Sequence, residues 1–180
     1  MAKKQKGSLL GIVFLCLVLV GLVLVVVGMF VGQVAYTHLE GLKETVTENI
    51  GLFHEDWGKV IDLVVMKITY PSNTLGVIAF IVAAVGLLVL LCTGVLQTLL
   101  KKDGSILNIV RIIGVVLTVV GAVLILVSGI TMANACYGDA KETLEKASIT
   151  YAPGIGVWLG FVGGLVGGIC GTLPLLKPFK

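Results

Sequence analysis

Four long apolar runs constrain the fold of this chain more than any other feature of its sequence. The runs cover residues 9–34, 74–100, 106–133 and 154–176, and they contain no aspartate, glutamate or lysine. A helix needs about 20 mostly apolar residues to cross the hydrocarbon core of a bilayer. The sequence therefore predicts an all-α integral membrane protein, a single domain with four transmembrane helices.

The medium decides the secondary structure of these runs. They are rich in valine and isoleucine, residues that favour strands in water. In lipid, however, an unpaired peptide group costs several kcal/mol, so a spanning segment must close its hydrogen bonds internally as a helix. The composition agrees with a membrane protein, because 57% of the 180 residues are hydrophobic and the mean hydropathy is +1.09.

Basic residues are distributed unequally between the two ends of the predicted bundle. The end with both termini and the loop 101–105 carries eight lysines and arginines and one acid, and the other end carries five lysines and nine acids. The positive-inside rule places the basic end in the cytoplasm. We therefore predict a multi-pass protein of the plasma membrane with both termini cytoplasmic. Anionic lipid headgroups account for the basic face, and no nucleic-acid partner is predicted.

The two outer segments, 35–73 and 134–153, are predicted to be helical. In the first, apolar residues follow one another at steps of three and four, which is the pattern of an amphipathic helix. We expect the first membrane helix to continue past Gln33, break near residues 49–51 and return as a second helix over 52–68. The outer stripe is formed by Leu42, Val46, Phe53, Trp57, Val60 and Val64. In the second segment, residues 140–148 indicate two helical turns.

The two halves of the chain show a faint repeat. Each half contains an outgoing helix, an outer segment and a returning helix, and the segments share Lys43-Glu44-Thr45-Val46 and Lys141-Glu142-Thr143-Leu144. Small residues also recur every seven positions in both outgoing helices, at 21 and 28 and at 114, 121 and 128. These similarities suggest a duplication with parallel halves.

The fourth run contains the strongest local pattern, two rows of glycines spaced four residues apart. The first row is Gly156, Gly160, Gly164 and Gly168, and the second is Gly163, Gly167 and Gly171. Such rows allow another helix to approach closely in a membrane. We expect a helix–helix contact here. It forms either inside the protomer, where Gly28 and Gly32 of the first run or the row 114, 121 and 128 of the third offer a matching surface, or between protomers, as an oligomer seam or a pore lining.

Cysteine and histidine patterns predict no metal or cofactor site. Cys16, Cys92 and Cys170 fall inside the apolar runs, and Cys136 lies at the outer boundary. No Cys-x-x-Cys motif or mixed Cys/His spacing occurs. The only metal-like group is His38, His54, Glu55 and Asp56, whose spacing is better explained by a solvated acidic helix.

The layout resembles that of the claudin and tetraspanin classes of four-span proteins. The claudin motif of the first outer segment, Gly-Leu-Trp followed by two cysteines, is absent. The nearest residues are Gly51-Leu52-Phe53, and no cysteine lies between Cys16 and Cys92. The Cys-Cys-Gly motif of tetraspanins is also absent. The resemblance therefore implies a four-span topology and assigns no role to any residue.

These observations predict a non-enzymatic membrane protein that acts in assembly, as a homo-oligomer or as a small structural subunit of a larger membrane complex. The alternative is an oligomeric channel or an uncoupled transport protein, in which glycine rows or outer segments line a conduit. Ion-coupled transport is disfavoured because Arg111 is the only charged residue that approaches the membrane, near the end of its run where it can snorkel.

Overall fold

The computed structural model describes most of the chain. The described residues are 2–40, 44–53, 60–62, 67–69, 71–100, 104–138, 141–146 and 148–176. Four long helices dominate them: α1 (Ala2–Phe30), α2 (Thr74–Thr98), α3 (Ser105–Tyr137) and α5 (Ile155–Leu176). Each is long and apolar enough to cross a membrane, which confirms a long apolar helix in each of the four predicted runs.

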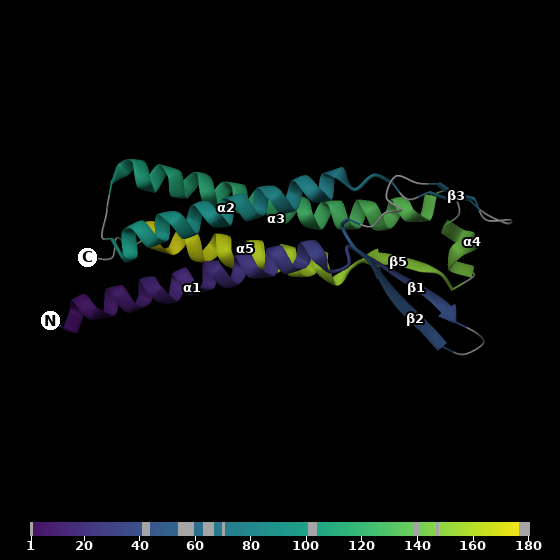
Figure 1. Cartoon of the computed structure of the whole chain (residues 1–180), viewed down its shortest axis with the longest axis horizontal. Helices are drawn as coiled ribbons and strands as arrows, with labels where there is room; N and C mark the ends of the chain where they lie inside the picture. The colour runs from purple at the N-terminus through teal and green to yellow at the C-terminus, as the bar shows by residue number, and fades with distance from the viewer. Residues whose placement is uncertain are drawn as a thin grey trace.

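The four helices form an antiparallel bundle with two different ends. Figure 1 shows successive long helices running in opposite directions, with the N-terminus and the C-terminus at one end and the strands at the other. We call these the terminal end and the strand end. The most extensive helix pairs are α1 with α5 and α2 with α3, so each half of the chain supplies one helix to each pair.

The bundle buries one core and leaves large apolar side chains on its outside. Phe80, Leu87, Ile125 and Val157 are fully buried at its centre. Side chains on the outer faces, such as Val116 and Ile169, are more than half exposed. Lipid tails are as apolar as these side chains, so the pattern suits a bundle surrounded by hydrocarbon rather than water.

Small residues bring α2 and α3 into close contact. A Cβ atom at Gly86 of α2 would lie 2.5 Å from the backbone nitrogen of Thr118, and one at Gly121 of α3 would lie 2.5 Å from that of Ala83. The row 114, 121 and 128 in α3 therefore faces α2. Gly21 and Gly28, the corresponding row in α1, face α5, so the two rows occupy equivalent places in the two halves.

The strand end carries a three-stranded antiparallel sheet in the order β2-β1-β5. Its strands are β1 (Val34–Glu40), β2 (Glu44–Ile50) and β5 (Thr150–Pro153). A second pair is formed by β3 (Val60–Asp62) and β4 (Lys67–Thr69). The short helix α4 (Lys141–Lys146) lies inside the range 140–148 that the sequence indicated as helical.

The prediction of helical outer segments was wrong where strands are described, which are β1 to β4 in the first segment and β5 in the second. α1 ends at Phe30 instead of continuing past Gln33, and strands follow it. The structure places Val46 in β2, Val60 in β3 and Phe53 in an exposed turn, with its ring centroid 6.0 Å from that of Phe30. The other three residues of the predicted stripe, Leu42, Trp57 and Val64, lie outside the described residues.

The reason for the error lies in the spacing. A step of four residues keeps two side chains near one face of a helix, but it also keeps them on the same face of a strand, since four is a multiple of the strand period of two. Val46 and Ile50 therefore fit both structures. The local composition decides between them, because Tyr36, Thr37, Thr45 and Thr47 are of the β-branched and aromatic types that favour strands outside lipid.

Candidate functional site

The predicted glycine surface of α5 lies inside the protomer in this structure. Its side toward α1 takes one glycine from each row and is packed against backbone: a Cβ atom at Gly156 would lie 2.5 Å from the carbonyl oxygen of Gly28, and one at Gly163 would lie 2.7 Å from that of Gly21. The carbonyl oxygen of Gly32 accepts a hydrogen bond from the Gly156 N–H at 2.9 Å. Glycine is needed at these positions because any side chain would push α1 away.

The remaining glycines of α5 face the other two long helices. Gly160 packs against Phe80 and Ile125, Gly164 against Ala122, and Gly168 more loosely against Val119 and Thr118. Gly167 and Gly171 receive the side chains of Leu87 and Leu90 of α2. Together the glycines of the two rows let α5 contact three neighbouring helices of its own chain.

Gln33 joins the helical bundle to the sheet. Its side chain is buried, and its Nε2 donates hydrogen bonds to the carbonyl oxygens of Gly28 at 2.5 Å and Val31 at 3.1 Å. Gly28 lies in the last turn of α1 and Val31 directly follows it, at a helix end where the helix itself supplies no donors. The backbone of Gln33 also bonds to the Ile50 carbonyl and the Gly154 N–H. One residue thus ties together α1, the end of β2 and the start of α5.

Three tyrosines fix the sheet on the end of α3. The Tyr137 hydroxyl accepts a hydrogen bond from the Tyr151 N–H at 2.9 Å and donates one to the Tyr151 carbonyl at 3.3 Å. The Tyr151 ring packs edge-on against Tyr137 and is tilted against Tyr36, with both centroid distances 5.3 Å. Together with Val34, Cys136 and Leu144, these rings form a second core that makes the sheet a rigid extension of the bundle.

The opposite face of the sheet is rich in threonine. Alternate residues of a strand point to opposite faces, and the register places Thr37 opposite both Thr47 and Thr150. The Oγ1 atoms of Thr37 and Thr47 are 3.0 Å apart, within hydrogen-bonding distance, and Thr47 and Thr150 are exposed. This side of the sheet is a flat polar surface facing away from α3.

The outer edge of β2 is the most distinctive feature of the strand end. β2 pairs with β1 along all seven of its residues, and among the described residues no strand pairs with its other edge. Figure 1 shows β1 and β2 projecting to one side of the bundle, past the end of α1. The outer edge of such a strand presents backbone N–H and C=O groups that can pair with a strand of another chain.

Among the described residues of the sheet, Tyr36 has a shifted pKa. Partial burial, and secondarily the negative charge of Glu48 opposite it in the register, raise the pKa of the Tyr36 hydroxyl above its ordinary value of 10.0. Both effects disfavour the tyrosinate form. Tyr36 is therefore a neutral hydrogen-bonding group throughout the physiological range.

No described group of residues assembles a metal site. Among the residues that the structure describes, no three His, Cys, Asp or Glu side chains lie close enough to hold an ion, and all four cysteines are free thiols. His38 is in β1, while His54, Glu55 and Asp56 lie outside the described residues.

No protein-family model, curated protein or solved structure matches this chain. Its function therefore has to be inferred from its own geometry. At the strand end, the outer edge of β2 has no strand partner among the described residues, and such an edge can bind another polypeptide through its backbone.

The structure also corrects the expected position of Arg111. Instead of snorkelling, its side chain is only 3% exposed and points into the bundle, where Nη1 donates a hydrogen bond to Oε1 of Gln97. Gln97 in turn donates from Nε2 to Oδ1 of Asn108 at 3.0 Å. The sequence placed Arg111 near the end of its run, but nothing in its spacing revealed that it meets Gln97.

Proposed function

We propose that this chain is a non-enzymatic four-span membrane protein that acts in assembly, with copies associating through the edge strand β2. The proposal includes a plasma-membrane location with both termini in the cytoplasm, as the distribution of basic residues favours. The strand end then lies outside the cell. The open edge of β2, seven residues long and projecting from the bundle, is the observation that carries it.

Two features support an assembly role for this edge. First, Gln33 and the tyrosine cluster hold the sheet rigidly, so a partner strand would bind a preformed template without ordering it first. Second, β2 can pair with itself. An antiparallel register centred on Thr47 places Glu44 opposite Ile50 and Glu48 opposite Val46, so no two glutamates face each other directly.

Disulfide crosslinking in membranes tests this proposal. Opposing residues in antiparallel strands have Cα atoms about 4.5–5.5 Å apart, which falls within the range that a disulfide accepts. Cysteines are introduced singly from position 45 to position 49 in a background in which the exposed Cys16 and Cys92 are alanine. We expect Thr47→Cys to give the most covalent dimer under mild oxidation, with yields falling on either side.

Thr150→Cys is the matched control. It is the same substitution at an exposed position on the same face of the sheet, but on β5 instead of β2. A covalent dimer of Thr47→Cys without one of Thr150→Cys supports pairing through the outer edge of β2. Equal yields at both positions, or no dimer at any of the five positions while light scattering shows a monomer, would refute self-assembly through β2.

A further inference from the structure

The turn after β2 is packed onto the strand end of the helical bundle. It consists of Gly51, Leu52 and Phe53. Although Leu52 lies outside the long helices, its side chain is only 2% exposed and belongs to the bundle core. A Cβ atom at Gly76 of α2 would lie 3.1 Å from the Leu52 Cδ1 atom. Leu52 thus fixes the turn against the helices.

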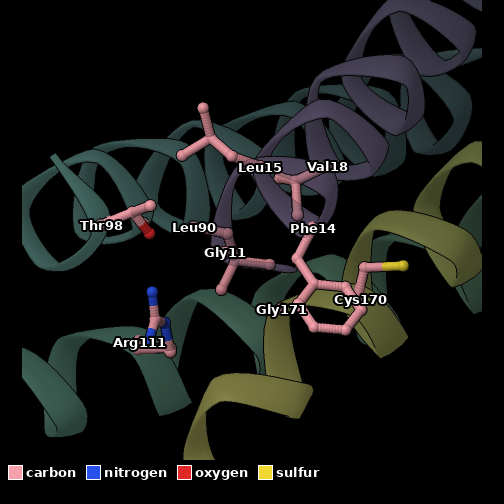
Figure 2. A pocket seen from close by; sticks show the side chains of 10 residues that line it. Gly11, Phe14, Leu15, Val18, Leu90, Thr98, Arg111, Cys170 and Gly171 are labelled. Carbon is pink, nitrogen blue, oxygen red and sulfur yellow. The ribbon is translucent and has the colours of Figure 1, made fainter. Parts of the chain in front are cut away.

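The terminal end of the bundle is packed differently. All of the described residues that line a small gap there belong to the four long helices, and Figure 2 shows Phe14 of α1 and Arg111 of α3 beside this gap. The helices fill the terminal end with their own side chains, whereas at the strand end a residue of the outer segment enters the core. The burial of Leu52 therefore gives the turn a fixed position relative to the membrane-spanning helices.

Phe53 points away from the core and lies beside a second exposed aromatic ring. Its side chain is 59% exposed, and its ring centroid is 6.0 Å from that of Phe30, which is 70% exposed. The two rings meet although one belongs to the last turn of α1 and the other to the turn after β2. Adjoining exposed aromatic rings form the kind of apolar surface that a membrane or a partner covers.

Phe30 lies on the face of α1 that is directed toward lipid. Val23, Val27 and Phe30 follow one another at steps of four and three residues, and all three side chains are exposed, so they share one face of the helix. Residues 9–30 correspond to about 33 Å of helix, which is close to the hydrocarbon thickness of about 30 Å. Phe30 therefore lies where the hydrocarbon ends at the strand end.

The first turn of α5 lies at the same level. A Cβ atom at Gly156 would lie 2.5 Å from the carbonyl oxygen of Gly28, which is in the last turn of α1 together with Phe30. Ile155 and Trp158, which are also in the first turn of α5, are exposed. Tryptophan is enriched at the interface between hydrocarbon and headgroups. Its position in α5 therefore agrees with the level that Phe30 marks on α1.

The exposed surface of α3 changes character at a corresponding place. Ile130 is the last large apolar residue that is exposed on this helix, although the helix continues to Tyr137. The residue before it, Gly129, packs against Val157 in the first turn of α5. Three helices therefore agree on the level at which the lipid-facing surface ends, and Phe53 lies at this level.

We propose that the turn 51–53 anchors the sheet to the bilayer, with the Phe53 ring inserted at the interface of the leaflet at the strand end. Leu52 supplies the contact with the helices, and Phe53 supplies the contact with lipid. Apolar side chains bury their surface at the boundary of headgroups and acyl chains, as those of interfacial helices do. Lipid is favoured over a partner protein because Phe53 continues the surface of α1 that lipid already covers. Since β2 ends at Ile50, directly before the turn, the anchor also sets the height of this strand above the bilayer.

Tryptophan fluorescence of the full chain in lipid nanodiscs tests the proposal. Phe53→Trp is made in a background in which both native tryptophans, Trp57 and Trp158, are phenylalanine. We expect its emission to be blue-shifted relative to that of tryptophan in water. Phosphatidylcholine brominated near the carbonyl end of its acyl chains should quench it more than phosphatidylcholine brominated near the methyl end. Phe30→Trp is the control for a lipid-facing residue and should behave in the same way.

Thr150→Trp is the control for the part of the sheet that faces water, because Thr150 is exposed on the face of the sheet directed away from α3. Its tryptophan should be quenched by aqueous iodide, and several-fold less by brominated lipid than that of Phe53→Trp. Equal quenching of these two variants by brominated lipid would overturn the proposal. Protection of Phe53→Trp from both quenchers would also overturn it, because protein rather than lipid would then cover the ring.

Spin labelling provides the result if the tryptophan variants fail to fold. Phe53→Cys and Thr150→Cys are labelled with a nitroxide in a background in which the exposed Cys16 and Cys92 are alanine. The label at position 53 should collide more often with oxygen, which partitions into lipid, than with a water-soluble nickel complex. The label at position 150 should show the reverse. A preference for the nickel complex at both positions would contradict insertion of the turn.

Discussion

Replacing Gly163 by alanine tests the close packing of α5 against α1. The new Cβ atom would lie 2.7 Å from the Gly21 carbonyl oxygen and 2.7 Å from the Leu24 Cβ atom. Ordinary contacts between carbon and oxygen begin at about 3.3 Å, so α1 would have to move by about half an ångström. Neither contact can be relieved by rotating a flexible side chain, because one atom is backbone and the other is fixed to it.

Gly168→Ala gives the matched comparison. This residue is on the same helix, but its nearest neighbour would be the Val119 Cγ2 atom at 3.2 Å, which a small side-chain movement can relieve. Both substitutions gain about 1 kcal/mol of helix propensity. The difference in stability between the two variants therefore reports the steric clash at Gly163 alone. Overpacking typically costs about 1–3 kcal/mol, which corresponds to a Tm difference of about 2–12 °C for a chain of this size.

The measurement is thermal unfolding of both variants and the wild type in one mild detergent, at one scan rate. We expect Gly163→Ala to melt below the wild type and Gly168→Ala to melt at or above it. If the two variants melt within about a degree of each other, α1 and α5 do not pack as closely as the structure shows, and the explanation of the glycine rows fails.

Two further predictions concern the strand end. Tyr137→Phe removes the hydroxyl that bonds both backbone groups of Tyr151. The loss should cost about 1–3 kcal/mol and speed hydrogen exchange of the β5 amides, while unchanged exchange in β5 would contradict the anchoring role. Because the pKa of Tyr36 is raised, the folded state holds this proton more tightly than the unfolded state. The stability that this pKa shift contributes is fully present below pH 10. It is lost as the pH rises through the pKa that Tyr36 has in the folded state. Ultraviolet titration of tyrosinate should show a late-titrating group that Tyr36→Phe removes, and an unchanged titration curve would refute the assignment.

The sequence predicted the membrane part of the fold closely because lipid leaves few alternatives. The expected runs 74–100 and 154–176 agree with α2 and α5 within two residues at each end. Valine and isoleucine form helices there, since only a helix pairs every backbone group within one segment. The glycine rows also indicated a close contact with the first or the third helix, and the structure shows both contacts, whereas the contact of Gly167 and Gly171 with α2 was not predicted.

The strand end was not predicted because its determinants are long-range. β5 has only four residues, and it forms a strand by pairing with β1, which lies more than a hundred positions earlier in the chain. Periodicity within one segment contains no information about such a partner. The same limit hid the contact of Arg111 with Gln97, because the two residues are on different helices.

The pairing of the first long helix with the last one has a consequence for biosynthesis. A ribosome delivers α1 and β1 to the membrane well before α5 and β5 exist, so the glycine face of α1 and one edge of β1 have no partner during most of translation. The second and third helices, by contrast, can associate as soon as both are inserted. Maturation should therefore end with the arrival of the last helix, and a chain that stops before it would display an uncovered seam of glycines in the bilayer, which quality-control proteases can recognise.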